Sequence, residues 1–175
     1  MNTLSFSLAV NTEDSNFIDV FPVIDGKTVD ATVLDFIAIL AAEDLSFACF
    51  DIFTCSCGHA GCAGYFDPFI VASQPNAITW YTAGQIANLL GAPILTFEPS
   101  AYKAALATLR ADILRLHADG KTFTILTDVD WGSEDEEALI ILDPTKQEAQ
   151  MRAWMGAQPQ RDFALRELAE LATDN

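Results

Sequence analysis

Basic side chains are scarce in this sequence, and their scarcity limits the partners that it can attract. Nine Lys and Arg residues stand against twenty-five Asp and Glu, which gives a formal net charge of −16 at pH 7. Residues 1–100 contain eleven of the acids and a single base, Lys27. Nucleic acids and anionic lipids are bound mainly by Lys and Arg side chains that neutralise phosphate. We therefore expect neither a nucleic acid nor a membrane as a partner.

Two interpretations of this acidity stay open. Because few bases are near in sequence, carboxylates such as those of Asp14, Asp19 and Glu43 are expected to be exposed, and such a field would attract a basic protein. Alternatively, the acids only keep an apolar chain in solution, since 51% of the residues are hydrophobic and 19% are charged. The first interpretation predicts a protein-binding surface on these acids, and the second predicts none.

Long hydrophobic runs are also missing. The longest, "VLDFIAILAA", has about ten residues and includes Asp35, whereas a helix that spans a bilayer needs about 20. The opening "MNTLSFSLAVNTED" has no Lys or Arg and does not resemble a signal peptide. We therefore expect a cytoplasmic protein, in which the four cysteines are reduced and do not form two structural disulfides.

Motifs for catalysis are absent as well. The only histidines are His59 and His117, and the sequence has neither a G-x-S-x-G nucleophile motif nor a phosphate-binding glycine loop after a strand. Its many carboxylates show no pattern that would bring two of them into one cleft. These absences favour a protein without catalytic activity.

The N-terminal region predicts a pair of strands. In "LSFSLAV", from Leu4 to Val10, apolar residues alternate with small ones, which is typical of a half-buried strand. A second apolar run, "FIDVFPVI", ends at Asp25-Gly26, a strong signal for a hairpin turn. Pro22 has no N–H to donate to a sheet. We therefore expect this second strand at a sheet edge or with a bulge.

Helices and further strands follow. Val33, Ile37 and Leu40 recur at helical spacing, and Asp30 is the candidate cap of this helix. From Leu45 to Trp80, short apolar runs with short connections predict an antiparallel meander, and "LLGAPILTFEP" adds another strand.

The clearest helix covers residues 100–119 and should end at Gly120. Its predicted buried stripe consists of Tyr102, Leu106, Leu109, Ile113 and Leu116.

The C-terminal region completes the predicted fold. "KTFTILTDV" and "EALIILDP" suggest two more strands, and two helices are expected near Gln147–Met155 and Gln160–Ala172. The sum is a single α+β domain over residues 1–175, an antiparallel sheet (meander) with helices packed against it. The last helix could dock on the sheet or, as a minority alternative, form a homo-oligomer with a second copy.

A cysteine-rich loop, "CSCGHAGCAG", is the most unusual stretch. Cys55, Cys57, His59 and Cys62 could together supply the four ligands of a zinc site, although structural zinc usually takes its ligands in pairs from two separate segments. Cys57 and Cys62 could also form a redox pair across a hairpin. The favoured interpretation is a tight turn without a cofactor, in which the cysteines pack as small apolar side chains. Cys49, in "FACF", is expected in the core.

The same loop supports a resemblance. "CSCGHAGCAG", followed by "ITW" and "FEPSAYKAAL", resembles a family of uncharacterised bacterial proteins with a C-x-C-G-x-x-G-C hairpin loop upstream of a Trp strand and an F-x-x-x-x-Y-x-x-A-L helix start. "FPVIDGKTV" is similar to the upstream hairpin of those proteins. The resemblance implies this order of elements, assigns no catalytic residue, and implies that histidine is not required at His59.

A row of cationic residues marks the helix over 100–119. Lys103, Arg110 and His117 recur every seven residues, with Arg115 and Lys121 nearby. The row could bind an anion, but such stripes more often pair with carboxylates of the same protein.

Taken together, the sequence predicts a non-catalytic protein-binding module of the immunity, antitoxin or regulatory kind. The alternative is a small metalloprotein that holds zinc in the cysteine loop.

Overall fold

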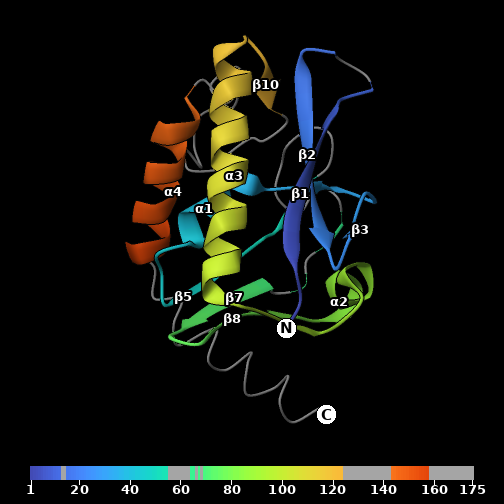
Figure 1. Ribbon diagram of the computed structural model, residues 1–175, viewed down its shortest axis with the longest axis vertical. Coiled ribbons are helices and arrows are strands. Elements are labelled where there is room, and N and C mark those ends of the chain that lie inside the picture. The colour runs from blue at the N-terminus through green and yellow to red at the C-terminus, as the bar shows by residue number, and fades with distance from the viewer. Residues whose placement is uncertain (13–14, 55–63, 66, 68, 124–142, 158–175) are drawn as a thin grey trace.

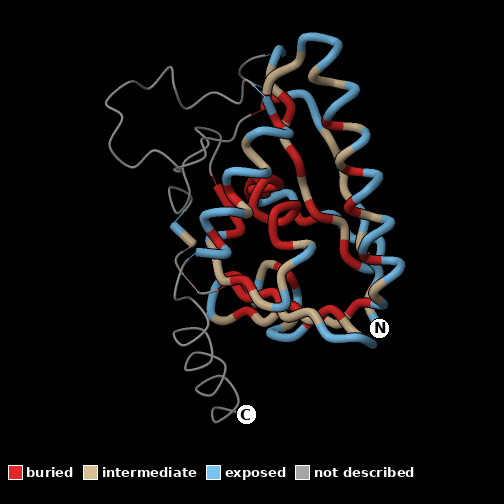
Figure 2. The backbone as a smooth tube through the Cα atoms, turned by 90° about the vertical axis from the view of Figure 1, so that its left-hand side faces the viewer, coloured by how far each residue is buried: buried red, intermediate tan, exposed pale blue. Residues whose placement is uncertain are grey.

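The structure of the protein, a computed structural model, describes residues 1–12, 15–54, 64–65, 67, 69–123 and 143–157. Within these residues it is an α+β fold in which helices pack against mainly antiparallel sheets (Figure 1). The fold class predicted from the sequence is confirmed. In Figure 2 the buried residues run through the interior, and the outward sides of the helices are exposed.

The first sheet is built on a long antiparallel pair, β1 (Leu4–Val10) and β2 (Phe17–Ile24). The turn predicted at Asp25-Gly26 is confirmed, because both residues have positive φ, 51° and 78°, and join β2 directly to β3 (Lys27–Thr28). On the far side of β2, β10 (Thr122–Phe123) adds in parallel, so the order is β1-β2-β10. Among the strands of the described residues, β1 therefore forms one edge of this sheet.

The prediction for Pro22 was wrong, since its strand is neither at an edge nor bulged. β2 lies between β1 and β10, and its register with β1 is continuous. Asp25 N donates to Thr3 O and Asn11 N donates to Phe17 O, so the odd-numbered residues of β1 and β2 bond to one another. Pro22 is even-numbered, so its nitrogen points away from β1 and its missing N–H costs no bond to that strand; on the other side Pro22 O accepts from Val29 N.

The second sheet is the predicted meander. β5 (Phe47–Phe50), β7 (Phe69–Gln74), β8 (Ala77–Thr82) and β9 (Ile94–Phe97) pair in this order, each antiparallel to the next. The run expected as one strand after Leu45 is broken, because β6 (Phe53–Thr54) pairs instead with β4 (Val33–Leu34). Cys49 lies half-buried in β5 opposite Ile70, and its neighbour Ala48 is the buried residue.

The first helix starts later than predicted. α1 is Phe36–Ala42, and Asp35, not Asp30, caps it by accepting a hydrogen bond from Ala38 N at 2.9 Å. Val33 and Leu34 belong to β4, because they pair with β6. All seven residues of α1 are buried, so the helix passes through the core.

A short helix, α2 (Gly84–Leu90), was not predicted. Its N-cap residue, Ala83, has no side chain that can cap. Asp67 replaces it by accepting a hydrogen bond from Gln85 N at 2.7 Å. The start signal of α2 therefore comes from a residue that lies distant in sequence.

The long helix α3 is Pro99–Ala118, close to the predicted 100–119, and Gly120 follows it with φ 79°. Four of the five residues of its predicted stripe are buried, and Leu116 is half-buried. α4 (Pro144–Ala157) contains the predicted helix Gln147–Met155. The expected helix Gln160–Ala172 and the strand in "EALIILDP" lie outside the described residues.

The helices meet the sheets over an aromatic core. The ring of Trp80 on β8 contacts Phe69, Phe97 and Tyr102 at centroid distances of 5.1, 4.9 and 6.1 Å. α3 contacts β1, β8 and α4, while α1 packs against α4 and β5. No helix within the described ranges is both long and apolar enough to cross a bilayer. This arrangement places α3 beside the edge strand β1.

Candidate functional site

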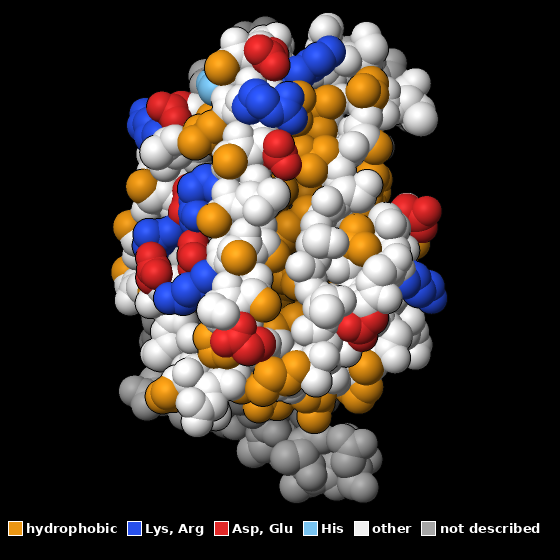
Figure 3. Space-filling view, in the orientation of Figure 1, with side chains coloured by type: hydrophobic (Ala, Val, Ile, Leu, Met, Phe, Trp, Pro, Cys, Tyr) orange, Lys and Arg blue, Asp and Glu red, His pale blue; other side chains and the backbone are white. Residues whose placement is uncertain are grey.

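An apolar groove runs between β1 and α3. Leu4, Phe6 and Leu8 line it from β1, and small residues, including Ala104 and Thr108, line it from α3. Its volume is about 300 Å³. Figure 3 shows it as a band of hydrophobic side chains exposed between the helix and the strand. Grooves of this size with apolar walls are common binding sites.

On β1, which forms one wall of the groove, alternate residues have backbone N–H and C=O groups that do not bond to β2. Odd-numbered residues of β1 bond to β2, as the hydrogen bonds of Thr3 and Asn11 show. The N–H and C=O groups of Leu4, Phe6 and Leu8 must therefore point to the opposite edge. Within the described part of the chain, no backbone hydrogen bond reaches these groups. The edge of β1 beside the groove is open.

The path of the chain after β9 explains why this edge stays open. Asn2 N donates to Thr96 O at 2.7 Å, and Asn2 Oδ1 accepts from Thr96 N at 3.0 Å. β9 thus begins to pair with the N-terminal strand, through a parallel bridge between Asn2 and Phe97. Glu98 then caps α3 at Pro99, and the chain continues as a helix. Pairing on this edge stops at Asn2, and α3 runs alongside.

The residues of α3 that form the other wall of the groove have mostly small side chains. Ala is the strongest helix former, so the sequence "PSAYKAALATL" favours a helix without large side chains on every face. Tyr102, Leu106 and Leu109 anchor α3 in the core. Ala101, Ala104 and Thr108 face the groove and are exposed. Space therefore remains between helix and strand.

Charge is sparse in the groove. Among the described residues that line it, Asp112 is the only ionisable one. Arg115 Nη2 lies 3.2 Å from Asp112 Oδ1, and this pair is largely exposed. At the other end, the Glu98 carboxylate accepts from Ser100 Oγ and from Ala101 N, and the first of these bonds is the main reason why the pKa of Glu98 is lowered. Glu98 caps α3 and does not line the groove, so Asp112 provides the one carboxylate among the described lining residues.

The three acids expected to bind a partner differ in whether the structure describes them and in how far they are exposed. Asp14 lies outside the described residues, and Asp19 is half-buried and accepts from Asn11 Nδ2 at 3.2 and 3.1 Å. The expectation that Glu43 is exposed was wrong, because its side chain is 14% exposed and lies 2.7 Å from Arg110 Nη2. Glu43 belongs to an internal ion pair and not to a free surface.

Several acids have a local structural role. The N-termini of the four helices α1 to α4 each receive a carboxylate, which accepts from backbone N–H groups and opposes the positive end of the helix dipole. The residues are Asp35, Asp67, Glu98 and Asp143. Asp25 accepts from Thr3 N at 2.7 Å, which is the main reason why its pKa is lowered, and from Asn2. Part of the acidity therefore serves folding.

Two of the five cationic residues on and near α3, Arg110 and Arg115, pair with carboxylates of the same protein. Arg110 donates hydrogen bonds to Glu148 and Glu43, and those that the Glu148 carboxylate accepts are the main reason why the pKa of Arg110 is raised. Arg115 pairs with Asp112 and Asp119. Lys103 is exposed and His117 is half-buried. Of the row Lys103, Arg110 and His117, only Arg110 pairs with carboxylates among the described residues, and an anion site on the row stays a prediction.

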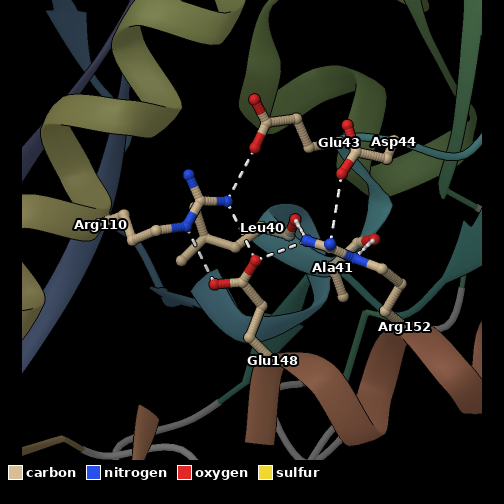
Figure 4. Close-up of polar contacts among 7 residues, drawn as sticks. All are labelled: Leu40, Ala41, Glu43, Asp44, Arg110, Glu148 and Arg152. Carbon is tan, nitrogen blue, oxygen red and sulfur yellow. Dashed lines mark hydrogen bonds and ion pairs between the residues drawn. The ribbon is translucent and has the colours of Figure 1, made fainter. Parts of the chain in front are cut away.

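Figure 4 shows how this pairing extends to α4. Arg152 donates to Glu148 Oε1 at 2.6 Å and to the carbonyl oxygens of Leu40 and Ala41, and its Nη1 lies 3.2 Å from Asp44 Oδ2. Two carbonyls in the last turn of α1 thereby gain a hydrogen-bond donor. This cluster connects α1, α3 and α4 and has a structural role.

The predicted zinc ligands belong to the cysteine loop. Cys55, Cys57, His59 and Cys62 lie outside the described residues. Among the residues that are described, no group of three or more His, Cys, Asp or Glu side chains could hold a metal ion. Zinc in the cysteine loop therefore stays a prediction.

No protein-family model, no curated protein and no solved structure matched this chain. The resemblance based on the cysteine loop also stays a prediction. The function must therefore be inferred from the geometry. The groove was missed at the level of sequence, although two signals for it exist there, the uncharged strand "LSFSLAV" and the run of alanines in α3.

Proposed function

We propose that this protein is a non-catalytic binding module that holds a segment of another protein in the groove between β1 and α3. The observation that carries the proposal is the open edge of β1: Leu4, Phe6 and Leu8 line the groove, and their backbone groups point away from β2 and have no backbone partner among the described residues. Open strand edges beside a groove are a recurring means of binding peptides.

The composition of β1 supports this role. Edge strands in natural proteins are usually protected from unwanted pairing by charged residues, proline or bulges. β1, "LSFSLAV", has no charged residue and no proline, and it pairs with β2 without a bulge. Val10, at its end, is 55% exposed. An unprotected edge of this kind is prone to unwanted strand pairing, and a role in binding a partner explains why it is kept.

The proposal keeps the expected class of protein and changes the contact surface. A binding module of the immunity, antitoxin or regulatory kind, acting in the cytoplasm, is still the expected role. Its contact no longer depends on Glu43, because that carboxylate is engaged by Arg110. The groove offers a continuous apolar surface, which separate acids do not.

The test is a selection of seven-residue random peptides, displayed as fusions, on the purified protein. We expect groups of related peptides that bind the protein but not the variant Ala104→Trp, in which an indole fills the groove. Ala107→Trp is the matched control, because Ala107 is also exposed on α3 but does not line the groove. Peptides should bind this control as they bind the original protein.

Both variants change exposed positions, so their thermal unfolding should stay close to that of the original protein. The proposal fails if no peptide is enriched, or if every enriched peptide binds the Ala104→Trp protein as well as the Ala107→Trp protein.

A further inference from the structure

We infer that the occupant of the groove is an extended, basic segment of a partner protein that adds to β1 as a further strand. This inference rests on the proposed function and specifies its ligand. Three features of the described residues support it: the spacing of the open backbone groups, the pairing already present at Asn2, and the distribution of charge.

The spacing of the open groups suits an extended chain. Leu4, Phe6 and Leu8 present N–H and C=O groups at every second residue along one edge. From Leu4 to Leu8 the strand rises about 13 Å, so a partner segment of about five residues would pair with all of them. A helix in the groove has no free backbone groups in its middle and would leave those of β1 without partners. An added strand satisfies them.

An isolated parallel bridge between Asn2 and Phe97 already lies at the start of this edge. Asn2 lies on the same edge as Leu4, because both are even-numbered; its backbone N donates to Thr96 O of β9, and its side-chain Oδ1 accepts from Thr96 N. A partner strand would continue the line of β9 from the point where the chain turns into α3. Its alternate side chains would lie against Ala101, Ala104 and Thr108, whose small size leaves room for them.

Charge favours a basic segment over a second copy of this chain. Asp112 is the one ionisable residue among the described residues of the groove wall, and its partner Arg115 is 61% exposed and also reaches Asp119. A Lys or Arg of the incoming segment could therefore pair with Asp112. Two copies of a protein with a formal charge of −16 repel each other. A basic segment is attracted by the same charge.

The first part of the test concerns charge. From the seven-residue random library we expect groove-dependent peptides to be enriched in Lys and Arg and depleted in Asp and Glu. Asp112→Asn should weaken the binding of a selected basic peptide by about tenfold. Asp119→Asn is the matched control, since it removes an equal charge beside Arg115 but does not line the groove. It should change the affinity much less.

The second part concerns strand addition. Selected peptides are synthesised with N-methyl groups on one alternate set of amides or on the other, which removes the N–H donors of one edge at a time. We expect one set to weaken binding by at least about tenfold and the other to have little effect, because only one edge of the segment faces β1.

The outcomes separate the two proposals. If groove-dependent peptides are found but show no basic bias, or if both methylated sets bind equally, the inference is wrong and the proposed function stands. If the peptides form helices when bound, strand addition is likewise excluded. If no groove-dependent peptide is found, the proposed function fails, and this inference fails with it.

Discussion

Arg110 on α3 donates two hydrogen bonds of 3.0 Å to the two carboxylate oxygens of Glu148 on α4. This geometry matches the planar guanidinium to the carboxylate and is the strongest form of such a pair. Arg110 also donates to Glu43, at the end of α1. One side chain therefore connects three helices that are separated in sequence.

Replacing this arginine should destabilise the protein. In Arg110→Met the aliphatic stem is retained, but Glu43 and one side of Glu148 lose their partner in a partly buried site. We expect the free energy of unfolding to fall by about 2 kcal/mol, between the effects of exposed and of fully buried pairs. Chemical denaturation measures it.

Arg115→Met is the control for this prediction. Arg115 is 61% exposed, against 30% for Arg110, and its pairs lie on the surface. We expect a loss below about 0.5 kcal/mol. Equal losses in the two variants would contradict the structural role given to Arg110.

Gly84 should not tolerate a side chain. It has a φ of 48°, and a Cβ there would overlap the carboxylate of Asp67, which caps α2. Gly84→Ala should therefore lower the stability by more than about 1 kcal/mol. Thermal and chemical unfolding provide the measurement.

Gly156→Ala is the matched control for Gly84→Ala. Gly156 lies in α4, and a Cβ there would meet no atom within 4 Å. The substitution should stabilise the protein by up to about 1 kcal/mol, because Ala is the better helix former. If Gly84→Ala also stabilised the protein, the cap by Asp67 would be refuted.

The buried hydroxyl of Tyr102 should contribute to stability. Trp80 Nε1 donates to it at 3.2 Å within the core. Tyr102→Phe would leave this N–H without an acceptor, at a cost of about 1–3 kcal/mol. A variant as stable as the original protein at neutral pH would show that the bond is not needed.

The same tyrosine predicts a dependence on alkaline pH. Burial raises the pKa of the Tyr102 phenol, so the folded protein retains a proton that the unfolded chain loses above about pH 10. The free energy of unfolding should therefore fall as the pH rises beyond this value. In Tyr102→Phe the decline should be shallower. Parallel slopes in the two proteins would argue against the effect.

The cysteine loop gives a prediction about metal. If it is a packed turn, as the sequence favours, Cys57→Ser and Cys62→Ser should reduce stability without releasing an ion. Elemental analysis of the purified protein decides the matter. About one equivalent of zinc in the original protein, lost in both variants, would establish the metalloprotein alternative.

Some elements could be predicted because their signals are local. The hairpin at Asp25-Gly26 requires positive φ at two adjacent positions, which these residues adopt readily. Pro99 at the start of α3 and Gly120 after its end act within one helical turn. For these elements, neighbouring residues are sufficient.

Other boundaries depended on distant partners. The helical spacing of Val33, Ile37 and Leu40 suited a longer helix, but β6 takes Val33 and Leu34 into a strand pair. Likewise, α2 lacks a local cap and uses Asp67. No window of sequence contains both partners at a recognisable spacing.

By itself, the sequence determined the α+β class, the alternation of β1, the turn after β2 and the long helix α3, since each follows from contacts between residues a few positions apart. Tertiary structure alone decided that β1 is an edge strand and that Glu43 faces Arg110, 67 positions away. It also decided that α3 lies beside β1 and leaves a groove there. The physical reason is that edges, ion pairs and grooves form between segments whose approach depends on the packing of the whole core.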